Sequence, residues 1–182
     1  MNKKSGAFNS VRALTVSAML TALSVVIGIF CKNFLNFGMG LFRVTFENLP
    51  ILMSGILFGP LAGGLVGAAS DLISYMLSSQ VYPPNLIVTA GAVTVGVVSG
   101  LVSRLTRRKG QNARIILSCS LAHLAGSMII KPIGLYQFYG ILVLWRIPLY
   151  LVIAPLEILI ICLLFRKESI KKLFTQVGGE IK

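Results

Sequence analysis

The chain has 182 residues, of which 55% are hydrophobic and only 5 are acidic, and its formal net charge is +12. A mean hydropathy of +0.86 excludes a soluble nucleic-acid binder despite this basic charge, because the Lys and Arg residues cluster between long apolar stretches. The length leaves room for about six or seven membrane-spanning helices of about 20 residues each. We therefore expect an all-α, polytopic membrane protein that forms a single domain over residues 1–182.

Six helices are expected in chain order. The first apolar run is too long for the apolar part of a signal peptide, so we interpret it as a retained helix. The second is too short to cross a bilayer unless it tilts or the loop before it enters the bilayer. Gly59-Pro60 ends the second helix, and Pro83 and Pro84 break the chain after the third. The expected ranges are 11–31, 48–58, 61–79, 86–105, 112–131 and 144–165.

Three clusters of basic residues, at 3–12, 104–114 and 166–172, predict the orientation of the chain. An even number of crossings puts all three on the cytoplasmic side, so both termini are expected in the cytoplasm. Four basic residues fall instead at outer helix ends or in outer loops, which makes them candidates for ligand binding. The alternative is that their side chains reach toward lipid headgroups. These residues are Lys32, Arg43, Lys131 and Arg146.

Asp71, His123 and Glu157 are the ionisable groups of the apolar segments, and Glu47 lies at an outer boundary. An acid inside a bilayer costs about 2.5–3.5 kcal/mol and indicates a functional site. Asp71 is expected about 15 Å along the third helix, where a carboxylate can accept two parallel hydrogen bonds from the N–H/NH2 edge of a pterin or guanine-like ring. The alternative is an ion pair with a Lys or Arg. His123 and Glu157 lie at comparable depths, so we expect them to pair with each other.

Aromatic residues are frequent in the outer segments and include Tyr75, Tyr82 and Trp145. They form either an interfacial belt or a stacking pocket for a flat ligand. Together with the outer cations, such a pocket suits an aromatic anion. The sequence has no P-loop, no zinc-protease motif and no paired carboxylates, so we expect neither an enzyme nor a metal or cofactor site. Cys31, Cys119 and Cys162 show no spacing typical of a disulfide or zinc site.

The stretch Arg43-Val44-Thr45-Phe46-Glu47-Asn48-Leu49-Pro50, the Gly- and Leu-rich run 55–67 and Asp71-Leu72 resemble the substrate-binding S components of energy-coupling factor (ECF) vitamin transporters. Ala18-Met19-Leu20-Thr21-Ala22 is similar to the AxxxA motif by which that family docks on its transmembrane coupling subunit. Helices two to four, with Tyr82-Pro83-Pro84 in the loop, look most like the folate branch. The stretch 131–136 departs from that branch and leaves the contacts of the ligand's tail open.

The resemblance implies a multi-pass protein of the bacterial cell membrane that captures a vitamin, folate, from outside. Its implied partners are the coupling subunit, which would dock on Ala18 and Ala22, and two ATPase subunits; nucleic acid is not among them. The ligand can also be another vitamin, such as pantothenate or a pyridoxine-like ring. A membrane scaffold subunit and an intramembrane enzyme acting on a lipid are further alternatives. The expected substrate-binding residues are Asp71 for the pterin edge, Lys131, Arg43 or Arg146 for the glutamate carboxylates, and Tyr75, Tyr82, Asn85 and Trp145.

Overall fold

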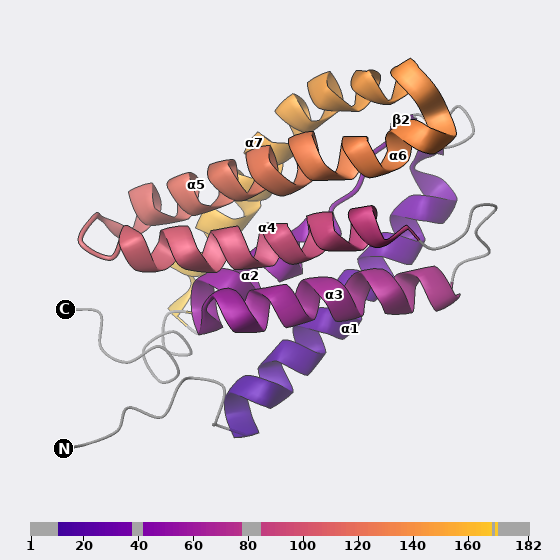
Figure 1. Cartoon of the computed structure of the whole chain (residues 1–182). Coiled ribbons are helices and arrows are strands. Elements are labelled where there is room, and N and C mark those ends of the chain that lie inside the picture. The colour runs from indigo at the N-terminus through magenta and orange to yellow at the C-terminus, as the bar shows by residue number, and fades with distance from the viewer. Residues whose placement is uncertain (1–10, 38–41, 78–84, 169, 171–182) are drawn as a thin grey trace.

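A computed structural model describes residues 11–37, 42–77, 85–168 and 170, and it shows a bundle of helices packed side by side (Figure 1). The strands β1 and β2, of two residues each, pair antiparallel after the first helix. The all-α prediction is confirmed. The elements are α1 (Val11–Phe34), β1 (Asn36–Phe37), β2 (Phe42–Arg43), α2 (Asn48–Phe58), α3 (Pro60–Leu77), α4 (Leu86–Leu105), α5 (Gln111–Ala122), the π-helix η2 (His123–Ile130), α6 (Lys131–Tyr139), the 3-10 helix η3 (Gly140–Trp145) and α7 (Arg146–Arg166).

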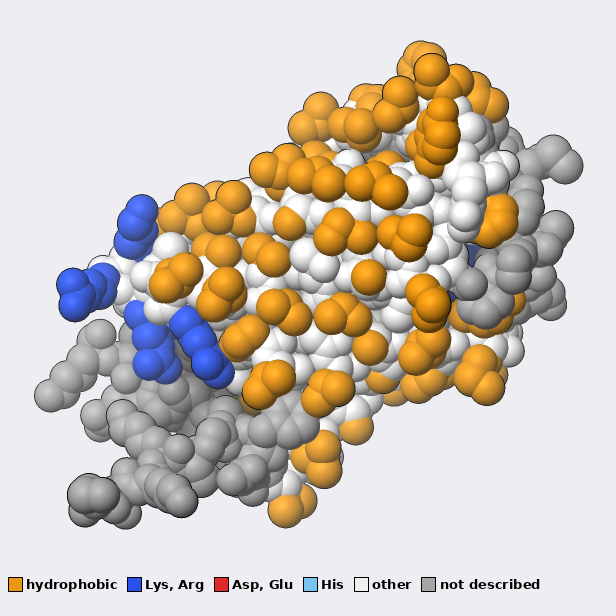
Figure 2. Space-filling view, viewed as in Figure 1, with side chains coloured by type: hydrophobic (Ala, Val, Ile, Leu, Met, Phe, Trp, Pro, Cys, Tyr) orange, Lys and Arg blue, Asp and Glu red, His pale blue; other side chains and the backbone are white. Residues whose placement is uncertain are grey.

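The surface has the distribution of side chains that a membrane protein needs. Figure 2 shows hydrophobic side chains along the sides of the bundle, and Lys and Arg gathered at the end where α4 joins α5. We call this the basic end. Five helical segments of the described residues are long and apolar enough to cross a membrane. The chain is therefore a multi-pass membrane protein, and the cytoplasmic position of its termini stays a prediction from the basic clusters.

The short helix α2 lies entirely inside the protein, since all of its 11 residues are buried. Eleven residues rise only about 16 Å, which is too short to span a bilayer. The non-helical segment 44–47 leads into α2, and Ser24 Oγ donates a hydrogen bond of 2.7 Å to the Glu47 carbonyl. Irregular backbone at membrane depth is tolerated where protein surrounds it. The segment before α2 thus packs against α1, and both the tilt of this helix and the entry of the loop into the bilayer stay predictions.

The fifth helix is longer than predicted. We expected it to end at residue 131, but α5, η2 and α6 continue one another to Tyr139. Pro132 lies in the first turn of α6, where the N–H group that proline lacks is tolerated. The π-helical turns before it change the spacing of the backbone carbonyl groups, so the proline ring avoids the carbonyl group with which it would clash in a regular α-helix. The chain reverses instead at Gly140, which has a positive φ of 56°. The other boundaries either agree with the predicted ranges, as both ends of α2 and α4 do, or differ from them by one to three residues.

Helices α3 and α4 pack with their backbones in contact. A Cβ atom added at Gly96 would meet the carbonyl group of Gly63, and one added at Gly67 would meet the carbonyl group of Ala92. Small residues permit such close approach, which is the main source of helix association in lipid. This contact fixes α3, and with it Asp71, against α4.

Gly96→Ala is therefore expected to destabilise the bundle by about 1–3 kcal/mol or more, because the new methyl group must push α3 away from α4. The measurement is thermal unfolding in detergent together with the yield of monodisperse protein. Gly110→Ala is the matched control, since nothing lies within 4 Å of a Cβ atom at that position. Equal stability of the two variants would contradict the close packing.

Candidate functional site

A small depression of about 200 Å³ lies between α1, α3, α4 and α6, with the start of α2 at its base. It brings together two of the predicted site residues, Asp71 from α3 and Lys131 from α6. Most of its other lining side chains are also polar. The described lining residues are Ser24, Glu47, Ile51, Ser70, Asp71, Ser74, Ala92 and Lys131.

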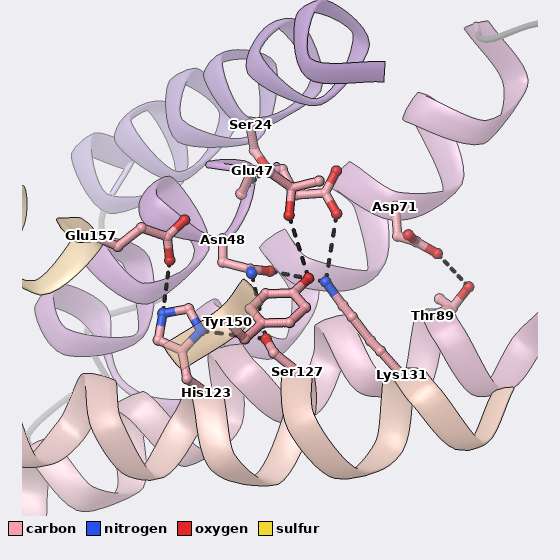
Figure 3. Close-up of polar contacts among 11 residues, drawn as sticks. Ser24, Glu47, Asn48, Asp71, Thr89, His123, Ser127, Lys131, Tyr150 and Glu157 are labelled. Atoms are coloured by element: carbon pink, nitrogen blue, oxygen red, sulfur yellow. Dashed lines mark hydrogen bonds and ion pairs between the residues drawn. The ribbon is translucent and has the colours of Figure 1, made fainter. Parts of the chain in front are cut away.

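Asp71 is half-buried in the wall of the depression. Thr89 Oγ1, from α4, donates a hydrogen bond of 2.6 Å to Asp71 Oδ2 (Figure 3). The partner on α4 is thus a hydroxyl group, not the Lys or Arg of the alternative prediction. A hydroxyl donor orients the carboxylate but leaves its charge in place, so Asp71 keeps the capacity to bind a donor group of a ligand.

Lys131 is almost fully buried, with 5% of its surface exposed. Its ammonium group lies 3.5 Å from Glu47 Oε1 and donates a hydrogen bond of 2.9 Å to Asn48 Oδ1. A buried ammonium group needs such partners because the loss of its hydration is costly. Glu47 therefore compensates the charge of Lys131, and Asp71 adds a further carboxylate to the same depression.

A chain of polar side chains continues from Lys131 into the centre of the bundle (Figure 3). Asn48 Nδ2 donates to Ser127 Oγ at 3.4 Å, and Ser127 Oγ lies 3.4 Å from His123 Nδ1. His123 Nε2 lies 2.7 Å from Glu157 Oε2 of α7, and both side chains are buried. The predicted pairing of His123 with Glu157 is confirmed. This chain links α2, η2, α6 and α7 at the base of the site.

His123→Ala is expected to destabilise the protein by about 3–5 kcal/mol, because it leaves the Glu157 carboxylate buried without its partner. Thermal unfolding in detergent measures this effect. The double variant His123→Leu/Glu157→Leu removes both polar groups and should recover most of the lost stability. Glu168→Ala changes an exposed carboxylate and serves as the control. A double variant less stable than His123→Ala would contradict the account of the pair.

The other predicted substrate-binding residues lie at different places. Asn85 caps α4 by accepting a hydrogen bond of 2.9 Å from the Ile87 N–H, and its amide donates to the Gly134 carbonyl, so it joins α4 to α6. Tyr75 is half-buried one turn beyond Asp71, and Trp145 is 60% exposed at the end of η3. Neither is among the described lining residues.

Arg43 and Arg146 are described only in their backbone. Arg43 lies in β2, Arg146 begins α7, and these two elements are in contact with each other. Tyr82 lies outside the described residues. The substrate contacts of all three thus stay predictions.

Sequence reasoning placed Glu47 at an outer boundary and did not include Asn48 in the site. One signal for this region was present in the sequence. His123, Ser127 and Lys131 are spaced four residues apart, which puts three polar side chains on one face of an otherwise apolar helix. That stripe indicates polar partners on a neighbouring segment, and the structure supplies them from the start of α2.

Ala18 and Ala22 lie on the exposed side of α1, whereas Ser17 and Ser24 on the same helix are buried. The two alanines are therefore accessible to a partner helix. The described residues contain no group of His, Cys, Asp and Glu that could hold a metal ion.

The comparison with protein families gives one match that covers most of the chain. Residues 12–180 match the family described as "ECF transporter, substrate-specific component". A folate transporter of Clostridium novyi is 37% identical over 79 residues, which are 42% of this chain and 46% of that protein. The match therefore spans about half the length of this curated relative. A protein of Mycoplasma pneumoniae called "Uncharacterized protein MG098 homolog" is 31% identical over 90 residues, 50% of this chain and 18% of its own length.

A solved structure, described as the crystal structure of FolT bound with folic acid, has the same fold. It superposes with a TM-score of 0.64 and covers 82% of this chain and 90% of its own, at 21% sequence identity.

Proposed function

The chain belongs to the substrate-specific components of ECF transporters, and from this premise we propose that it captures folate outside a bacterial cell for delivery into the cytoplasm. The observation that carries the proposal is the depression in which Asp71 lies together with Glu47 and Lys131. The similarity to the Clostridium novyi folate transporter supports the choice of ligand. The protein binds and transports; it catalyses no reaction on its ligand.

The chemistry of the depression suits the pterin ring of folate. One edge of that ring carries neighbouring N–H and NH2 donors, and Asp71 offers the two oxygens that such an edge needs. Glu47 and Asn48 already bind the Lys131 ammonium group, which leaves the glutamate carboxylates of folate to other cations. We therefore place the pterin ring at the end of the site where Asp71 and Lys131 lie. Lys131 then stabilises the polar edge of the ring or, after a change of partner, a carboxylate of the tail.

The remaining predicted residues complete the proposed site toward the outer surface. Arg43 and Arg146, from neighbouring elements, are proposed to bind the glutamate carboxylates, since Arg forms paired hydrogen bonds with a carboxylate. Tyr75, Tyr82 and Trp145 are proposed to stack on the ring systems, and Asn85 to hold the rim through its contact with Gly134. In the structure described here the depression has room for about one water molecule, so a pterin ring needs the side chains and loops around it to move apart. The ligand would therefore stabilise a rearranged state of the outer loops.

Transport needs an energy source that this chain lacks, because its sequence contains no P-loop motif. We propose that Ala18 and Ala22 on α1 dock the ECF coupling subunit, which in turn carries two ATPase subunits. Both alanines are exposed, and small residues at this spacing allow two helices to approach closely in lipid.

The test is uptake of radiolabelled folate by bacterial cells that have no folate uptake of their own. Cells are given the chain, the coupling module, both or neither. The proposal expects uptake only when both are present, with unlabelled folate as competitor and labelled pantothenate as a control substrate. Uptake of pantothenate in place of folate would keep the transport function and overturn the assignment of folate as the ligand. If neither substrate were taken up, a scaffold role would be favoured.

A further inference from the structure

Ser70 of α3 lines the depression beside Asp71, and the residue is only 3% exposed. Its hydroxyl group is buried and has no hydrogen-bond partner among the described residues. Burial of a hydroxyl group without a partner is unfavourable, because the hydrogen bonds that it makes with water in the unfolded chain are not replaced. A ligand that enters the depression can supply the missing partner.

Two other buried serine hydroxyl groups lack a partner among the described residues, but they lie elsewhere. Ser17 is in α1 and Ser54 in α2, and neither is among the described lining residues of the depression. Of the other serines that line it, Ser24 donates to a backbone carbonyl group, and Ser74 has contacts of its own within the protein. The hydroxyl group of Ser70 is therefore the one at the depression that the described part of the protein leaves available to a ligand.

Ser70 and Asp71 are neighbours on one firmly packed segment. Their Cα atoms are about 3.8 Å apart, and both residues line the depression. One turn earlier the backbone of α3 touches that of α4, since a Cβ atom added at Gly67 would collide with the carbonyl group of Ala92. Such close packing holds the segment in place. The hydroxyl group and the carboxylate therefore stay next to each other when other side chains and loops move apart to admit a ring.

We infer that Ser70 is a further ligand-binding residue, which donates a hydrogen bond to the carbonyl oxygen of the pterin ring. In the proposed complex, Asp71 accepts hydrogen bonds from the N–H and NH2 groups of one ring edge. The next group along that edge is the carbonyl group, whose oxygen is an acceptor and is repelled by the carboxylate unless a donor lies beside it. The hydroxyl group of the neighbouring residue is such a donor.

The ammonium group of Lys131 is another donor at the depression, but Glu47 and Asn48 already bind it. The hydroxyl group of Ser70 needs no such change of partner within the described part of the chain. Together with Asp71 it would select rings that carry an amino group, an N–H group and a carbonyl group in this order, as pterins do. The inference rests on the proposed binding of folate and names the part of the ligand that the site recognises.

The test is isothermal titration of the full chain in detergent with folate and with its 4-thioxo analogue. The analogue keeps the N–H and NH2 groups, but its sulfur atom is a weaker acceptor than oxygen. Ser70→Ala should bind folate about twofold to tenfold more weakly than the unchanged chain. The unchanged chain should lose a similar factor when sulfur replaces oxygen, whereas Ser70→Ala should bind the two ligands within about twofold of each other, because the hydrogen bond is already absent.

Ser54→Ala is the matched control, since it also removes a buried hydroxyl group without a described partner, but away from the depression. It should bind both ligands as the unchanged chain does. Neither variant should melt at a lower temperature than the unchanged chain, because no hydrogen bond between described residues is lost.

Two results would overturn the inference and leave the proposed function standing. Unchanged folate affinity of Ser70→Ala would mean that the hydroxyl group contacts only solvent. Weaker binding by Ser70→Ala, with the full loss on sulfur replacement retained, would mean that the hydroxyl group acts without touching the carbonyl oxygen. Absence of folate binding by the unchanged chain is a different result, because it would overturn the proposed function and the inference with it.

Discussion

Asp71→Asn is expected to weaken folate binding by about tenfold to 150-fold. The substitution keeps the shape of the side chain but replaces one acceptor oxygen by an NH2 donor, which faces the donors of the pterin edge. Each lost charge-assisted hydrogen bond costs about 1.5–3 kcal/mol, and 1.4 kcal/mol corresponds to a tenfold change in affinity. Isothermal titration of the purified chain with folate measures the effect directly.

Two controls separate a lost ligand contact from a damaged fold. Thr89→Val removes only the hydroxyl group that orients Asp71, so a smaller loss, of about tenfold or less, is expected. Titration with pteroate, which lacks the glutamate tail, should show the same loss for Asp71→Asn as titration with folate. An unchanged affinity of Asp71→Asn for folate and pteroate, at an unchanged melting temperature, would remove Asp71 from the site.

Ala18→Leu/Ala22→Leu is expected to reduce folate uptake to background while folate affinity changes less than about twofold. Both alanines lie on the exposed side of α1, away from the depression. Two Leu side chains would keep a partner helix from the close approach that small residues permit. Uptake in cells that contain the coupling module and titration of the purified variant measure the two properties separately.

The matched control for this variant is Ala90→Leu, which enlarges an exposed alanine on α4. It should leave both uptake and affinity near their original values. If Ala18→Leu/Ala22→Leu bound folate poorly, the face of α1 would take part in the fold or in the site. If it transported normally, the docking surface would lie elsewhere on the protein.

The sequence predicted most helix boundaries because they depend on local signals. Gly59-Pro60 divides α2 from α3, and the ends of α4 agree with the expected range 86–105. The end of the fifth helix could not be predicted in this way. Pro132 is a strong local signal for the end of a helix, but the helix continues through it because the π-helical turns before it accommodate the proline ring. Those turns depend on contacts with other helices, such as the approach of Gly126 to Gly91, which local sequence does not encode.

The same distinction holds for the site. Asp71 was predicted because a charged residue in an apolar segment is conspicuous by itself, and Lys131 because it lies outside the basic clusters that explain the orientation of the chain. Their common depression, and the parts that Glu47 and Asn48 play in it, follow from the packing of segments far apart in sequence; Lys131 and Asn48 are 83 residues apart. Whether the loop before the second helix enters the bilayer was left open, because no local pattern distinguishes such a loop from one that stays outside.

The most direct test of the account is titration of the purified chain in detergent with folate, and with riboflavin, thiamine, biotin and pantothenate as controls, followed by heat and by Trp145 fluorescence. The account predicts saturable binding of folate with one site per chain and no binding of the four controls. Saturable binding of another vitamin, with none of folate, would contradict the folate assignment although the family stands. Binding of none of the five would contradict the proposed capture of a vitamin and favour a scaffold role.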